Sequence, residues 1–100
     1  VTSTTESPMT KLRKQNGREK PWNVKYWGMG NETWGCGGNM RPEYYADLYR
    51  QFASYTRAPE MYRIASGASD KDYNWTDVIL KNTSTMQWMI QGTTLHYNTM

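Results

Sequence analysis

Segments that favour helices alternate with segments that favour strands along this chain. This alternation restricts the possible folds more than any other property of the sequence. Three segments have the residue patterns that favour helices, at about 8–16, 42–57 and 74–82. Three shorter segments favour strands, at about 24–29, 61–65 and 93–97. Strands that alternate with helices of this length form right-handed β-α-β units and a parallel sheet. The sequence therefore predicts an α/β fold, either doubly wound or closed into a barrel.

The predicted helix boundaries rest on capping residues. Ser7 is a suitable N-cap and Pro8 a suitable first helical residue, while Asn16-Gly17 ends the first helix. Asn74 is the expected N-cap of the third helix. In the second helix an apolar stripe recurs at i, i+3, i+4 and i+7, and we expect it to be core: Tyr45, Leu48, Tyr49 and Phe52.

The chain has the marks of a fragment. It opens on Val1 without an initiator methionine, and Thr99-Met100 follow directly on the last predicted strand. Hydrophobic residues make up 37% of the chain and the mean hydropathy is -0.92, both low for a domain that buries its own core. We therefore expect residues 1–100 to be a piece of one larger domain.

Charge and cysteine content argue against several classes of protein. The 12 basic and 9 acidic residues give a formal charge of +3, and the basic ones cluster near the amino end at Lys11, Arg13, Lys14, Arg18 and Lys20. Clusters of this size are usually solvated faces, so we expect no nucleic-acid partner. The single cysteine excludes an internal disulfide and gives no metal-ligand spacing. No apolar stretch approaches the ~20 residues of a membrane span, so no membrane partner is expected.

Polar residues gather just after each predicted strand, as Asn31-Glu32, Ser69-Asp70 and His96-Tyr97-Asn98. In a parallel α/β fold the carboxyl ends of the strands build the active site. The phosphate-binding fingerprint of doubly wound folds is missing, because Gly28-Met29-Gly30 is followed by Asn, Glu and Thr rather than by a spaced third glycine. Glu32 is the strongest candidate for a catalytic residue. The alternative interpretation is that Glu32 is an ordinary loop carboxylate.

The residues around Glu32 resemble a known family. The run 22–40, which reads WNVKYWGMGNETWGCGGNM, closely resembles the fourth-strand signature of the family 51 glycoside hydrolases that are α-L-arabinofuranosidases. Other segments resemble the same family in the same order: 7–10, 16–18, 42–49, 72–76 and 95–97. The resemblance covers nearly all of the chain. It implies that the chain forms about strands four to six of a (β/α)8 TIM barrel, which needs about 250 residues in full.

The resemblance also implies a chemistry. The family belongs to the retaining glycosidases whose acid/base is the Glu of an Asn-Glu pair, here Glu32. Such enzymes need a carboxylic acid and a carboxylate nucleophile about 5 to 5.5 Å apart, and the family's nucleophile follows strand seven, outside this chain. We expect apolar or like-charged neighbours to raise the pKa of Glu32. Asn31 would bind the sugar hydroxyl next to the anomeric carbon.

Three further residues have expected roles in binding the sugar. His96 is either a core imidazole or, as the resemblance implies, a contact to sugar or carboxylate. Trp34, between glycines, would form a cleft wall that stacks on sugar rather than core. Asn98 stands where the family commonly has a Tyr near the nucleophile, which predicts reduced activity. Cys36 is expected to be a small loop residue near the site, because no base to activate it is identifiable.

The resemblance therefore predicts a retaining α-L-arabinofuranosidase that acts on arabinan or arabinoxylan oligosaccharides, with no cofactor and no metal. The isolated chain, without a nucleophile, should be inactive. Family members without signal peptides are cytoplasmic and often homo-oligomers. Two alternatives stay open: another retaining barrel glycosidase that acts on β-glycans, and a non-catalytic sugar-binding module. One departure concerns stability, since Arg41 replaces the usual Thr cap of the second helix, at a cost of about 1 kcal/mol.

Overall fold

The computed structural model describes residues 1–56 and 60–97. The predicted end of the second helix at Arg57 and the site residue Asn98 lie outside this part. The elements follow in the order α1 (Pro8–Gln15), β1 (Tyr26–Met29), α2 (Pro42–Tyr55), β2 (Tyr62–Ala65), α3 (Tyr73–Thr83), the 3-10 helix η1 (Gln87–Met89) and β3 (Gly92–Thr93). The predicted alternation of helices and strands is confirmed.

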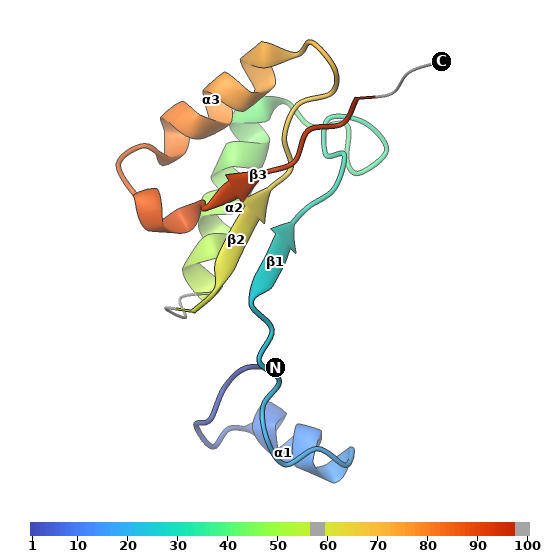
Figure 1. The fold of residues 1–100 in the computed structure, drawn as a ribbon, viewed down its shortest axis with the longest axis vertical. Coiled ribbons are helices and arrows are strands. Elements are labelled where there is room, and N and C mark those ends of the chain that lie inside the picture. Colours follow the sequence, from blue (N-terminus) through green and yellow to red (C-terminus); the bar gives the residue numbers. More distant parts are fainter. Residues whose placement is uncertain (57–59, 98–100) are drawn as a thin grey trace.

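The strands form a parallel sheet in the order β1-β2-β3. Tyr26 pairs with Tyr62 at the start of β1, Met29 pairs with Ala65 at its end, and Ile64 pairs with Gly92 of β3. Helices α2 and α3 lie together on one face of this sheet (Figure 1). The predicted α/β fold with parallel strands is therefore confirmed.

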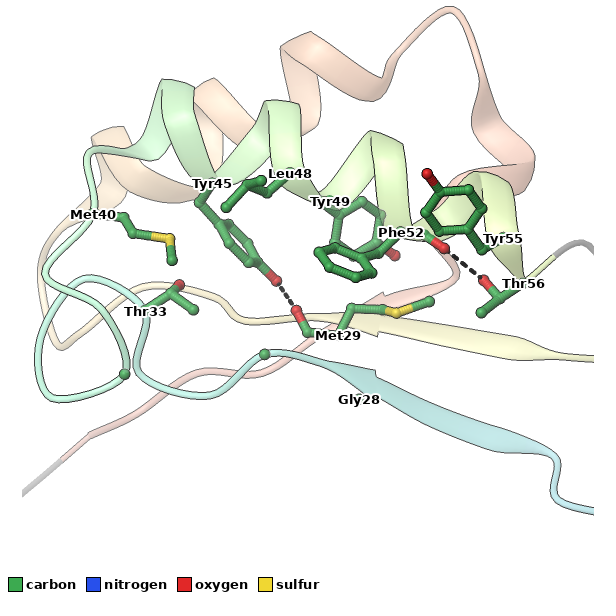
Figure 2. A pocket seen from close by; sticks show the side chains of 12 residues that line it. Gly28, Met29, Thr33, Met40, Tyr45, Leu48, Tyr49, Phe52, Tyr55 and Thr56 are labelled. Carbon is green, nitrogen blue, oxygen red and sulfur yellow. Dashed lines mark hydrogen bonds between the residues drawn. The ribbon is translucent and has the colours of Figure 1, made fainter. Parts of the chain in front are cut away.

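The core lies between the sheet and these two helices. Tyr45 and Tyr49 of α2 are buried, and the Tyr45 ring stacks on Trp75 of α3 with centroids 5.6 Å apart. The prediction that the whole stripe is core is wrong for Phe52, whose side chain is 56% exposed. Phe52 lies one turn beyond Tyr49, where α2 faces a cavity instead of packed side chains (Figure 2).

The predicted caps are correct for α1 and wrong for α3. The Ser7 hydroxyl accepts the backbone N–H of Thr10, and the Thr10 hydroxyl accepts that of Ser7, which together form a capping box. Helix α3 starts earlier than predicted and is capped by the Asp72 carboxylate, which accepts the backbone N–H of Trp75. Arg41 makes no side-chain cap on α2, as expected from its lack of an acceptor.

The third strand is shorter than predicted and begins earlier. The prediction placed it at 93–97, whereas β3 contains Gly92 and Thr93 only. The chain beyond it stays next to the segment that follows β2, because Ser69 and His96 form an isolated parallel bridge. The chain after Thr93 therefore pairs with its neighbour through a single bridge at His96, and not through the continuous strand predicted for 93–97.

Helix α1 lies apart from the sheet, beyond the amino end of β1 (Figure 1). Two guanidinium groups make local contacts here: Arg13 of α1 donates to the carbonyls of Ser3 and Glu19, and Arg18, after the helix, lies over the Trp22 ring at 4.7 Å. None of the helices in the described ranges is both long and apolar enough to cross a membrane.

Candidate active site

The polar segments singled out in the sequence meet at one end of the sheet. Chain segments leave β1, β2 and β3 at the same edge, where the parallel strands have their carboxyl ends (Figure 1). Glu32 follows β1, Ser69 follows β2 and His96 follows β3. The expectation that these segments are neighbours is confirmed by the bridge between Ser69 and His96 and by a contact between Glu32 and His96.

The loop after β1 is wound around the backbone of Glu32. Glu32 has a φ of 46°, a left-handed conformation that is uncommon outside glycine. Its carbonyl accepts the backbone N–H groups of both Gly35 and Gly37, each at 2.9 Å. A Cβ at Gly37 would lie 1.9 Å from the carbonyl oxygen of Asn31, so the loop closes this tightly only because residue 37 is glycine. The result is a fixed backbone beneath the Glu32 side chain.

The Glu32 carboxylate has a partner on each oxygen. Oε1 lies 2.9 Å from Nδ1 of His96, and Oε2 accepts the thiol of Cys36 at 2.8 Å. The side chains of His96 and Glu32 are 26% and 28% exposed, so the pair lies at the surface of the sheet edge and not within the core. Solvent and small solutes therefore reach this carboxylate.

These partners change the titration of Glu32 in the direction opposite to the one expected. The pKa of the Glu32 carboxyl is lowered, first because the Cys36 thiol donates a hydrogen bond to the charged form and next because His96 does so. The expected pKa increase required apolar or like-charged neighbours, and the described residues supply hydrogen-bond donors instead. The same contact raises the pKa of the Cys36 thiol.

His96 is held in place by the segment after β2. Its backbone N–H donates to the carbonyl of Ala68, and its own carbonyl accepts the N–H of Asp70 at 2.8 Å. That segment is fixed in turn by two aromatic side chains: the Tyr45 hydroxyl accepts the N–H of Ser66, and the Trp75 indole donates to the Ser66 carbonyl. Helices α2 and α3 therefore determine where His96 lies.

Trp34 combines a structural contact with a place beside the site. Its indole N–H donates to the carbonyl of Gly67 at 2.9 Å, and its half-buried ring packs against the core cluster. Its ring also meets the His96 ring edge-on, with centroids 6.0 Å apart at 85°. Trp34 thus ties the loop after β1 to the loop after β2, a role that its surrounding glycines did not suggest.

The remaining predicted residues are not all brought together. Asn31 is exposed in the same turn as Glu32, and Asn98 lies outside the described residues. Cys36 was expected only to be near the site, yet its thiol contacts Glu32 directly. No sequence signal could have found that contact, because it depends on the winding of an irregular loop.

Other features of the described residues do not add to this site. A cavity of about 440 Å³ lies between α2 and β1, lined by Met29, Met40, Tyr45, Leu48, Tyr49 and Phe52 among others (Figure 2). Glu32 and His96 do not line this mostly apolar cavity, so it is not where their chemistry takes place. Within residues 1–56 and 60–97, no group of three or more His, Cys, Asp or Glu side chains could hold a metal ion. The carboxyl edge thus holds a partly exposed carboxylate in contact with an imidazole and a thiol, with the Trp34 indole against that imidazole.

Known proteins match this chain along its length. A family model described as the alpha-L-arabinofuranosidase 1 domain matches residues 1–99. An intracellular exo-alpha-L-arabinofuranosidase from Bacteroides ovatus is 52% identical over 103 residues, which cover 100% of this chain and 20% of that protein. A probable alpha-L-arabinofuranosidase C from Aspergillus niger is 42% identical over 74 residues, which cover 70% of this chain and 14% of that protein.

A solved structure is also similar. The crystal structure of the GH51 arabinofuranosidase from Xanthomonas axonopodis pv. citri superposes with a TM-score of 0.86 and 43% sequence identity, covering 96% of this chain and 20% of that one. The chain thus spans about a fifth of the length of these two full-length relatives. A family match over almost every residue, joined to this structural agreement, shows that the chain belongs to the alpha-L-arabinofuranosidase family.

Proposed function

We propose that residues 1–100 are part of the catalytic (β/α)8 barrel of a retaining α-L-arabinofuranosidase, with Glu32 as its acid/base. The observation that carries the proposal is the Glu32 carboxylate at the carboxyl edge of a parallel sheet, held between His96 and Cys36. The family membership supplies the reaction class. The substrates would be arabinofuranosyl groups of arabinan or arabinoxylan oligosaccharides.

The sheet supports the barrel. Its strands lie side by side in the order of the chain, as successive strands of a β/α barrel do. The face away from α2 and α3 carries apolar side chains, with Tyr26 64% and Tyr62 39% exposed and their rings 5.4 Å apart. The interior of a closed barrel would cover that face. Strands outside this chain would pair with the free edges of β1 and β3.

The chemistry has two steps. Glu32 first donates a proton to the glycosidic oxygen while a carboxylate nucleophile attacks the anomeric carbon and the bond to the leaving group breaks. It then removes a proton from water, which attacks the same carbon and releases arabinose with retained configuration. The nucleophile would come from a part of the protein outside this chain.

The lowered pKa of Glu32 fits a group that works in both directions. A carboxylate nucleophile about 5 to 5.5 Å away raises the pKa of its neighbour by charge repulsion, and the donors Cys36 and His96 oppose that rise. Once the nucleophile is esterified by the sugar, its charge is gone and the donors favour the basic form of Glu32. The second step needs that form.

Other residues would bind the sugar. Asn31 is exposed one residue before Glu32, where its amide would reach the hydroxyl next to the anomeric carbon. Trp34 and His96 meet edge-on beside the carboxylate and would line the sugar cleft. Asn98, which lies outside the described residues, would bind the sugar with a shorter side chain than the Tyr common in the family. No cofactor is required by this chemistry.

The relative from Bacteroides ovatus is named as an intracellular enzyme, which supports a proposal for the cellular compartment. We propose the cytoplasm for this protein, with arabinose-containing oligosaccharides as partners and neither nucleic acid nor membrane. The full-length protein would be a homo-oligomer, as the family resemblance implies.

The test is the product and its configuration. The full-length protein is incubated with arabinan, arabinoxylan and β-glucan oligosaccharides, and the first sugar released is followed by proton NMR before it mutarotates. Arabinose released in the α configuration is the expected result. Hydrolysis of the β-glucan without arabinose release would favour the other glycosidase, and sugar binding without hydrolysis of any substrate would favour a binding module.

A further inference from the structure

The thiol of Cys36 faces the candidate acid/base and no described acid or base other than Glu32. Its Sγ lies 2.8 Å from Oε2 of Glu32, on the oxygen that His96 does not contact. Cys36 itself is exposed, so burial does not account for the presence of a thiol at this position. The contact joins residues four apart within one loop.

The loop presents this thiol in a fixed position. Cys36 lies between Gly35 and Gly37, whose N–H groups both donate to the Glu32 carbonyl. The backbone that carries the thiol is therefore hydrogen-bonded to the residue that carries the carboxylate. A Cβ at residue 37 would collide with the Asn31 carbonyl oxygen, so the close backbone approach next to Cys36 requires a glycine there.

We propose that Cys36 is a positioning residue for Glu32: the hydrogen bond from its thiol to Oε2 fixes the orientation of the carboxylate. This inference rests on the proposed function of Glu32 and adds a residue to it. A thiol donor is weak compared with a hydroxyl or an amide. This hydrogen bond orients the carboxylate during substrate binding. Because it is weak, it breaks easily when Oε2 takes up the proton that goes to the leaving group.

The carboxylate in turn keeps the thiol in its donor form. Its hydrogen bond and negative charge raise the pKa of Cys36, so the thiol stays protonated at neutral pH and does not act as a nucleophile. The titratable groups that face Glu32 are Cys36 from its own loop and His96 from the segment after β3. Asp70, after β2, reaches this group through its backbone N–H to the His96 carbonyl.

The contact is tested without reference to catalysis by the reactivity of the thiol. Full-length wild type and Glu32→Gln are alkylated with iodoacetamide at pH 8, and the peptide that contains Cys36 is quantified by mass spectrometry. Removal of the negative charge should speed alkylation by about threefold or more, because thiolate is the reactive form. Equal alkylation rates would overturn the proposed contact.

The kinetic role is tested by the pH profile of kcat/KM on an arabinoside with a poor leaving group. Cys36→Ala removes the donor, so the pKa of Glu32 rises and the basic limb of the profile should move to higher pH. The loss in kcat should be about 3- to 30-fold, less than the 10²–10⁴-fold for a missing acid/base. Cys36→Ser keeps a donor at this position and should restore most of the rate and the position of the limb.

Two controls separate the possible failures. Asn39→Gly alters the same loop at an exposed residue with a φ of 48°, a conformation that glycine adopts freely, and should leave both rate and limb unchanged. If Cys36→Ala leaves the basic limb in place while Glu32→Ala abolishes it, the positioning role is wrong and the proposed function stands. If Glu32→Ala leaves that limb unaltered as well, the failure belongs to the proposed function.

Discussion

Glu32 and His96 are 64 residues apart in the chain and 2.9 Å apart in space. The imidazole is oriented from both sides of its own backbone, by the Ala68 carbonyl and the Asp70 N–H. An acid/base that must approach a glycosidic oxygen at a set angle loses rate when it swings freely, because proton transfer depends on geometry before it depends on pKa. The contact with His96 would therefore orient the proposed acid/base.

A pair of substitutions isolates that contact. His96→Ala should lower kcat/KM of the full-length enzyme on natural arabinosides by about 10-fold or more, because Oε1 loses its partner and Trp34 loses its edge contact. His96→Asn places an amide nitrogen near the position of Nδ1 and should recover part of this loss. Steady-state kinetics of the two variants, side by side, measure the difference. Equal losses in both would show that the nitrogen on Oε1 has no part in the reaction.

At this scale the sequence identified single residues but not their relations. Glu32 and His96 were marked by their places after predicted strands, and the structure brings them into contact. The direction of the Glu32 pKa shift was predicted wrongly, because that direction depends on which groups fold next to the carboxylate. Cys36 is one of those groups. Its contact with Glu32 depends on turns of an irregular loop, which no periodic pattern in the sequence predicts.

At the scale of elements, Tyr45 links the ends of two strands. Its hydroxyl donates to the carbonyl of Met29 at the end of β1 (Figure 2). It also accepts the N–H of Ser66 just after β2, where the strand ladder stops. Burial raises the pKa of Tyr45 to about 12, so the phenol stays protonated and keeps both roles. The loops that carry Glu32 and His96 begin at this link.

Tyr45→Phe should therefore destabilise the protein by about 1–3 kcal/mol, because it removes the hydroxyl's hydrogen bonds to the part-buried Met29 carbonyl and the buried Ser66 N–H. The matched control is Tyr44→Phe, next in the chain but 53% exposed, which should change stability by no more than about 0.5 kcal/mol. Thermal unfolding of the full-length variants gives both values. A Tyr45→Phe protein as stable as the control would mean that the hydroxyl does not join the strands.

A second pair of variants tests the loop after β1. Gly37→Ala places a Cβ 1.9 Å from the Asn31 carbonyl oxygen, so the backbone must move and Glu32 with it. Gly35→Ala, two residues away, brings its Cβ no nearer than 3.9 Å to the Glu32 carbonyl oxygen. We expect a loss of activity of about 10²-fold or more for Gly37→Ala and little change for Gly35→Ala. Similar activity in the two variants would contradict the close approach at Gly37.

The start of α1 and the parallel direction of the strands were predictable, because both are marked by patterns in the sequence. The Ser7-Pro8 start of α1 and the parallel sheet follow from capping and alternation. The cap of α3 was predicted two residues late, because Asp72 and Asn74 are both good caps and the choice between them depends on where Trp75 must pack. The exposure of Phe52 likewise depends on what covers α2. The helical spacing of apolar residues does not reveal that.

At the scale of the whole molecule, the 100 residues leave large surfaces that other parts of a barrel would cover. Tyr26 and Tyr62 are exposed on the sheet face away from the helices, while Phe52 and Tyr55 are exposed on α2. Within the described residues, β1 and β3 are the outer strands of the sheet, and each pairs with one neighbouring strand only. These features agree with a chain that spans about a fifth of the length of the relatives from Bacteroides ovatus and Xanthomonas axonopodis.

The isolated 100-residue chain should therefore be inactive and should self-associate. It carries the candidate acid/base, but one carboxylate without a nucleophile does not complete a double displacement. Exposed aromatic faces and free strand edges promote association. Light scattering and turnover of an aryl arabinofuranoside by the purified chain check both expectations. Turnover by a monodisperse preparation would refute them, with the full-length protein as the positive control.

The dependence of the rate on the leaving group shows whether Glu32 is the acid/base. In full-length Glu32→Ala, turnover of natural arabinosides should fall by about 10²–10⁴-fold or more. An aryl arabinoside with an acidic phenol needs no protonation, so its first step should survive and give a burst followed by a slow steady state. Glu43→Ala, which removes an exposed carboxylate from the first turn of α2, is the control and should behave as wild type.

Azide completes the measurement, because it attacks the glycosyl-enzyme without help from a general base. Added to Glu32→Ala with the activated substrate, azide should speed turnover and yield an arabinosyl azide with retained configuration, identified by NMR. Equal loss on natural and activated substrates, with no response to azide, would contradict the assignment of Glu32 as the acid/base.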